Sequence, residues 1–145
     1  MKLMEVRNYL VARLPIEGIW FGVAKMDARK GKALCLYGAP GRMPSGVKVG
    51  GLDCTGYRQK RMMLVLRGGV DAAEAERLAF AVHEGLTADR VSVEIASAAG
   101  ACAVHGFMRA LDDEPYALGM DSFGVYEYRM DFEIFYEWLN RLVTK

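Results

Sequence analysis

Residues 124–138 of the chain read GVYEYRMDFEIFYEW and alternate between apolar and polar side chains almost without interruption. The apolar positions on one side are Tyr126, Tyr128, Met130, Phe132, Ile134, Tyr136 and Trp138. The positions between them are charged apart from Phe135, and they are Glu127, Arg129, Asp131, Glu133 and Glu137. A period of two residues is that of a β-strand with one buried and one polar face. The stretch is longer than the common strand of about five or six residues, so we expect it to span the whole sheet.

Two upstream segments have the periodicity of helices. Leucine or valine at positions 3, 6, 10 and 14 shares one face of a first helix, which Pro15 ends. A second helix begins after Asp71, a favourable N-cap residue, with Glu74 three positions later as in a capping box. Its apolar stripe at positions 75, 78, 79, 82 and 86 predicts that it packs on the sheet.

The other segments predict strands and loops. Residues 18–27 and 32–37 flank a short turn and predict a hairpin. Residues 57–67 predict a third strand, which follows a loop rich in glycine at 38–56. Residues 102–111 predict a shorter fourth strand before the long last one.

The predicted element order is α-β-β-β-α-β-β, which is typical of an α+β fold. We expect a mostly antiparallel sheet of four to five strands with the helices packed on one face, in a single domain covering residues 1–145. Residues 89–100 alternate like a strand but are flanked by alanines that also suit a helix, and residues 112–124 predict a turn-rich connection.

The composition points to an ordinary globular protein. The net charge of +1 gives no electrostatic reason to expect binding to nucleic acid or membranes, and no apolar run has the length of a membrane span. Charged residues interrupt the first 14 residues, so we expect no signal peptide and a cytoplasmic location. The three cysteines, an odd number without a Cys-x-x-Cys pair, predict buried thiols rather than a disulfide framework or a zinc site. His83 and His105 have no partner at a catalytic spacing, so we expect no enzyme and no cofactor.

Three segments together resemble a known family. These are the last strand GVYEYRMDFEIFYE, the stretch GGLD at 50–53 that leads into YRQKRMMLVLRGG at 57–69, and the helix from Asp71. They resemble phage minor capsid proteins, which are in turn similar to the tail terminators that form a ring where a siphophage tail meets the head. The resemblance implies a structural virion protein, made in the host cytoplasm, that self-associates into a ring, a hexamer on the tail. It also implies contacts with other phage tail and head-completion proteins.

The charges on two predicted strands suggest how subunits of such a ring meet. Basic Arg58, Arg61 and Arg67 lie on the third strand, and acidic Asp131, Glu133 and Glu137 lie on the last. Opposite charges on neighbouring strands or subunits fix register and partner choice, so we expect these six residues at a subunit interface. A metal site is disfavoured because side chains two apart on a strand lie roughly 7 Å from each other and do not converge. Lysine at positions 131 and 133 is expected to weaken assembly and leave the fold intact.

The 38–56 loop carries the other candidate contacts. Arg42 and Lys48 are expected to face the DNA path or an acidic partner in the resembled ring. The loop lacks the Gly-Lys-Ser/Thr of a P-loop. The alternative function is a small cytoplasmic ligand-binding or enzyme domain with its site at this loop. The aromatic stripe of the last strand is interpreted as a core face covered by helices, because a base-stacking platform needs a basic surface.

Overall fold

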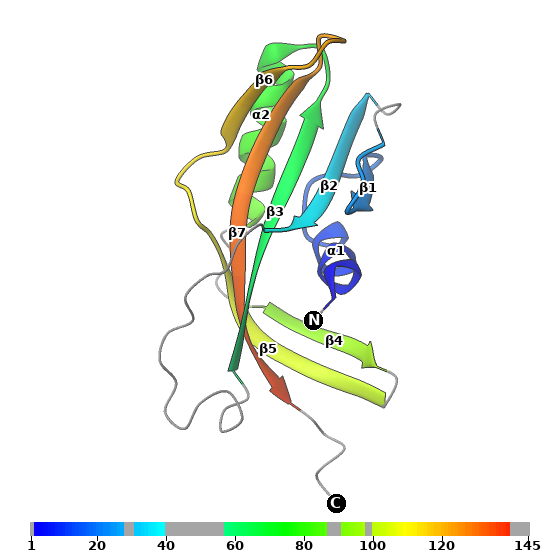
Figure 1. Ribbon diagram of the computed structural model, residues 1–145, viewed down its shortest axis with the longest axis vertical. Coiled ribbons are helices and arrows are strands. Elements are labelled where there is room, and N and C mark those ends of the chain that lie inside the picture. Colours follow the sequence, from blue (N-terminus) through cyan, green and yellow to red (C-terminus); the bar gives the residue numbers. More distant parts are fainter. Residues whose placement is uncertain (1, 28–30, 40–56, 87–90, 98–99, 140–145) are drawn as a thin grey trace, which may run out of the picture.

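The computed structural model describes residues 2–27, 31–39, 57–86, 91–97 and 100–139, with the backbone alone for 57–58, 91–97, 100–106 and 137–139. The helices are α1 (Leu3–Val11) and α2 (Ala72–Gly85). The strands are β1 (Trp20–Val23), β2 (Lys32–Gly38), β3 (Tyr57–Gly68), β4 (Val91–Ser97), β5 (Gly100–Ala110), β6 (Tyr116–Met120) and β7 (Tyr126–Leu139). Figure 1 shows β3 and β7 as the long pair that runs through the middle of the molecule.

All seven strands belong to one open, mostly antiparallel sheet. Its order is β1-β2-β3-β7-β5-β4, and β6 pairs with β7 beside the half of β7 that β5 leaves free. The predicted α+β class is therefore confirmed. The sheet has more strands than expected, because β4 forms in the segment that fitted either a strand or a helix and β6 forms in the expected connection at 112–124. The last strand spans the sheet as predicted, pairing with β3 on one side and with β5 and β6 on the other.

The predicted hairpin of the first two strands is wrong, because β1 and β2 run parallel. Trp20 lies beside Ala33 and Val23 lies beside Leu36. The chain turns away from β1 at Ala24, which has a left-handed φ of 63° and donates its N–H to the Leu36 carbonyl at 2.8 Å. β1 ends at Val23 and β2 begins at Lys32, so more residues separate the two strands than the roughly two to five of a hairpin loop.

Both helices cover the same face of the sheet. Val6 and Leu10 of α1, and Leu78 and Val82 of α2, belong to one buried cluster with side chains from even-numbered positions of four strands. Those side chains are Leu34, Leu36, Met62, Leu64, Leu66, Met108, Met130, Phe132, Ile134 and Tyr136. Each buried aliphatic or aromatic side chain contributes about 1.5–3 kcal/mol relative to an exposed one. The interpretation of the β7 apolar stripe as a core face is therefore confirmed from Met130 to Tyr136.

The N-terminus of α2 is fixed by two local features. The Asp71 carboxylate accepts hydrogen bonds from the N–H groups of Ala73 and Glu74 at 3.0 and 3.2 Å, which confirms the predicted cap. Glu74 itself pairs with Arg77 instead of completing a capping box. Close packing holds the helix on β3, because a Cβ added at Gly68 would lie 2.6 Å from the Cβ of Ala75. Glycine at position 68 therefore sets how closely α2 approaches the sheet.

Candidate functional site

The second face of the sheet carries the odd-numbered side chains of the central strands, and we call it the open face. Both helices contribute to the core on the opposite side. Along β3 the open face presents Gln59, Arg61, Met63, Val65 and Arg67, and along β7 it presents Glu127, Arg129, Asp131, Glu133 and Phe135. Because the register pairs these strands residue by residue, charges that are far apart in the sequence lie side by side.

A buried carboxylate organises the lower half of the open face. The Glu133 side chain is only 1% exposed. It accepts hydrogen bonds from Nε of Arg109 at 2.6 Å and from Nε2 of Gln59 at 2.9 Å, and it lies in register with Arg61 on β3. An ionised carboxylate removed from water is tolerated only where donors and opposite charges replace its hydration. Two hydrogen bonds and two neighbouring guanidinium groups satisfy that need here.

The guanidinium of Arg67 is the buried charge of the upper half. Its side chain is 7% exposed and lies 2.7 Å from Asp121 and 3.9 Å from Glu127. Hydrogen bonds from the N–H groups of Val125 and Phe123, together with Arg67, lower the pKa of Asp121, and the bond from Val125 is the largest cause. Arg67 therefore ties β3 to the turn between β6 and β7.

One further ion pair belongs to the polar network of this face. Arg129 donates from Nε and Nη2 to both carboxylate oxygens of Asp131, at 3.0 and 3.2 Å, and this pairing raises the pKa of Arg129.

At the end of the face formed by β1 and β2, the Trp20 ring lies over Gly22, where an added Cβ would lie 2.1 Å from the ring. Burial and a hydrogen bond with the Cys35 thiol raise the pKa of Tyr37 to about 12.

The structure brings four of the eight predicted site residues together. Arg61, Arg67, Asp131 and Glu133 all lie on the open face. Arg58 and Glu137 lie on the same two strands, in register with Tyr136 and Tyr57. Arg42 and Lys48 fall outside the described residues. The interface role of these residues stays a prediction.

The sheet order places the basic and acidic residues of the predicted interface on neighbouring strands of one chain. Since β3 and β7 are neighbours in the middle of the sheet, their charges pair within one chain and do not lie on separate edges. The expectation that lysine at position 133 leaves the fold intact conflicts with the burial of Glu133. A lysine there would bring a third positive charge between Arg61 and Arg109.

Sequence reasoning missed the residues that β5 contributes. Arg109 places its guanidinium 5.8 Å from the centre of the Phe135 ring, and Phe107 stacks on the same ring at 5.3 Å. The only available signal was the alternation of Phe107 and Arg109 within the predicted fourth strand. Their proximity to Glu133 depends on the register between β5 and β7, which the local sequence does not specify.

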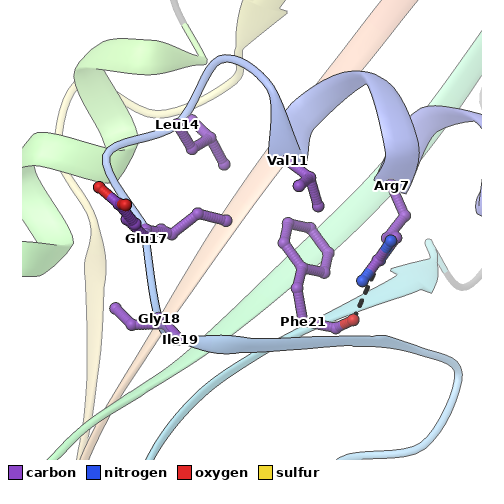
Figure 2. A pocket seen from close by; sticks show the side chains of 8 residues that line it. Arg7, Val11, Leu14, Glu17, Gly18, Ile19 and Phe21 are labelled. Atoms are coloured by element: carbon purple, nitrogen blue, oxygen red, sulfur yellow. Dashed lines mark hydrogen bonds between the residues drawn. The ribbon is translucent and has the colours of Figure 1, made fainter.

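A pocket of about 430 Å³ lies on the other side of the molecule, between α1 and β1. Figure 2 shows its lining, with Val11 and Phe21 facing each other and the Arg7 side chain reaching the Phe21 carbonyl, to which Nε donates at 3.0 Å. The remaining lining residues are Leu14, Ile16, Glu17, Gly18 and Ile19. The pocket is mostly apolar and contains none of the predicted site residues.

No group of three or more His, Cys, Asp or Glu side chains in the described part of the chain is placed to bind a metal ion. His83 is buried on α2, and its Nε2 lies 2.8 Å from the Asp112 carbonyl oxygen. Neither described helix has the length and apolar character needed to cross a membrane.

Comparisons with family models, curated proteins and solved structures found no match to this chain. The family resemblance therefore stands on the sequence segments alone, and the open face is the site from which a function must be argued.

Proposed function

We propose that this chain is a structural phage or prophage protein at the head–tail junction, and that copies of it form a ring that terminates the tail and joins it to the head. The open face is the proposed subunit contact. Two lines support the proposal: the likeness of residues 50–53, 57–69 and 124–137 and of the helix from Asp71 to the minor capsid family, and the gathering of four predicted interface residues on one face of the sheet.

The observation that carries the proposal is the fixed arrangement of charges on the open face. The buried side chains of Arg67 and Glu133 are held in place by ion pairs with Asp121 and Arg109, and Asp131 is held by Arg129. Half-buried Met63 and Val65 lie between Arg67 and Glu133 along the strand pair, half-buried Phe135 lies beyond Glu133, and all three supply apolar contact area. A surface of positioned charges around apolar side chains gives a docking partner both orientation and specificity. A cyclic ring needs a heterologous contact, in which this face meets a different surface of the next copy.

The alternative function, a ligand-binding or enzyme domain with its site at residues 38–56, stays a hypothesis, because that loop lies outside the described residues apart from Gly38 and Ala39. Binding of a small ligand that depends on residues 38–56, with no self-association, would favour this second function.

Sedimentation velocity over a wide concentration range, with and without magnesium, tests the ring. We expect a species near six times the 16.1 kDa mass of one chain. Replacing half-buried Met63 with Glu should abolish it, because a carboxylate on the open face would have to be desolvated in the contact. The matched control is Met4→Glu, at a position 52% exposed on α1. A wild-type chain that never exceeds a dimer would contradict the proposal.

A further inference from the structure

We propose that the pocket between α1 and β1 is a binding site for a small amphipathic carboxylate, that is, an apolar chain or ring that ends in one carboxyl group. The apolar part of the ligand lies on the buried side chains of the pocket, and its carboxylate binds the Arg7 guanidinium. This inference goes beyond the proposed ring and does not depend on it, because no residue that lines the pocket belongs to the open face.

The pocket has a buried apolar floor and an exposed rim. The floor consists of Leu14, Ile16 and Phe21, which are 6%, 4% and 5% exposed. Val11 and Glu17 are exposed and lie at the rim. The volume of about 430 Å³ lies within the range of small-molecule sites. A ligand that covers this floor removes apolar surface from water, which favours binding.

The floor is held in shape by the packing of α2 and by the turn that follows α1. A Cβ added at Gly85 of α2 would lie 2.5 Å from Cδ2 of Leu14, so the helix packs directly against that side chain. The Ile16 N–H donates to the Leu14 carbonyl at 2.8 Å, and the Ile19 N–H donates to the Ile16 carbonyl at 3.0 Å. Gly18, with a φ of 79°, completes the turn. A preformed pocket binds a ligand at a lower entropic cost than a segment that must first be ordered.

Arg7 is the cation of the pocket and is held in a fixed position. Its Nε donates to the Phe21 carbonyl at 3.0 Å, and its Nη1 donates to the Asn8 side-chain oxygen at 3.0 Å. Neither bond uses Nη2, for which the described part of the chain supplies no hydrogen-bond partner. A guanidinium that is fixed on one side and keeps donors free on another is well suited to bind a carboxylate.

Phe21 belongs both to the floor and to the surroundings of the cation. The guanidinium carbon of Arg7 lies 5.7 Å from the centre of the Phe21 ring. A ligand whose apolar part lies against this ring therefore has its carboxylate beside the guanidinium. At the opposite end of the lining, Figure 2 shows the Glu17 carboxylate turned away from the floor. The arrangement favours an anion over a cation.

Two other classes of ligand fit the pocket less well. A phosphate ester carries a charge of about −1.5 to −2, whereas the described lining residues include one basic side chain, Arg7, and the acidic Glu17. A purely apolar ligand covers the floor and leaves the Arg7 donors without a partner, so we expect it to bind more weakly than a carboxylate of the same length.

Titration of the full chain with sodium octanoate, followed by calorimetry and by the amide resonances in NMR spectra, tests the inference. We expect saturable binding with a dissociation constant of about 1 mM or lower, and the largest resonance shifts within residues 7–21. Octylamine has the same apolar chain and the opposite charge. It should bind about tenfold more weakly or worse, because it cannot accept hydrogen bonds from Arg7 as a carboxylate does.

Two variants separate the floor from the cation. Val11→Trp should abolish saturable octanoate binding, because the larger side chain occupies the space that faces the Phe21 ring. The matched control is Val70→Trp, at a position 72% exposed in the connection between β3 and α2, which should bind octanoate like the wild-type chain. Arg7→Gln should weaken octanoate binding about tenfold and leave octylamine binding unchanged, since only the carboxylate uses the guanidinium.

The results separate this inference from the proposed ring. Absence of saturable octanoate binding, equal affinities for octanoate and octylamine, or wild-type affinity in Val11→Trp would overturn it. If Arg7→Gln does not fold, the comparison of the two ligands and the Val11→Trp chain decide. Sedimentation of the same samples reports on the ring independently, so a chain that forms rings without binding octanoate would overturn this inference alone.

Discussion

Replacing Glu133 with Gln is the sharpest test of how the open face is held together. The change keeps the size of the side chain and removes the charge that binds Arg109 at 2.6 Å and accepts from Gln59 at 2.9 Å. The new amide keeps one oxygen as an acceptor and turns an NH₂ group toward donors, so at least one of these hydrogen bonds is lost.

The expected cost follows from burial on one side of the pair and exposure on the other. Breaking a fully buried ion pair costs about 3–5 kcal/mol, because the partner charge stays buried. Here the Arg109 side chain is 62% exposed and water can solvate it again, which lowers the cost. We expect a loss of about 2 kcal/mol, close to one hydrogen bond to a charged group. In a chain of this length that corresponds to a melting temperature lower by about 5–8 °C.

Urea unfolding followed by circular dichroism measures this loss as a change in the midpoint at constant m-value. The matched control is Asp113→Asn, at an exposed position, which should change the free energy of unfolding by less than about 0.5 kcal/mol. A double-mutant cycle with Arg109→Gln isolates the coupling between the two side chains. A Glu133→Gln chain as stable as the control would refute the conclusion that this carboxylate organises the face.

Three further predictions concern other parts of the fold. Gly68→Ala should lower the free energy of unfolding by about 1–3 kcal/mol in the same urea assay, because the added methyl group would lie 2.6 Å from the Ala75 Cβ, and an unchanged midpoint would contradict the packing of α2. Asp121 has a lowered pKa in the folded state, so its contribution is complete above the ordinary aspartate pKa of about 3.9 and is lost as the pH falls through the folded value. Unfolding measured from pH 6 to pH 2 should therefore lose part of its pH dependence in Asp121→Asn, and identical slopes would count against the role of its bonds to Arg67 and the backbone. The Tyr37 hydroxyl should ionise at about 12 in ultraviolet titration, and stability should fall as the pH rises from about 10 toward that value, whereas a Tyr37→Phe chain should lack this component.

Much of the architecture is readable from local sequence because it depends on periodicity. The alternation from Tyr126 to Tyr136 predicts both the strand and its buried face, since a side chain on a strand points opposite to its neighbours. The stripe of α2 and its Asp71 cap are equally local features. The short β6 was missed, because its five residues are all exposed and lack the alternation of a half-buried strand.

The arrangement of the site depends on strand pairing, which the local sequence does not predict. The sequence alone determined that Arg61 and Arg67 share one face of a strand and that Asp131 and Glu133 share one face of another. Only the tertiary structure decided that these strands are neighbours, that β1 and β2 run parallel, and that β5 brings Arg109 to Glu133. The physical reason is that side-chain direction along a strand is fixed by the chain's own geometry, whereas pairing and register minimise the free energy of the whole sheet, in which distant segments must bury apolar area and satisfy buried charges together.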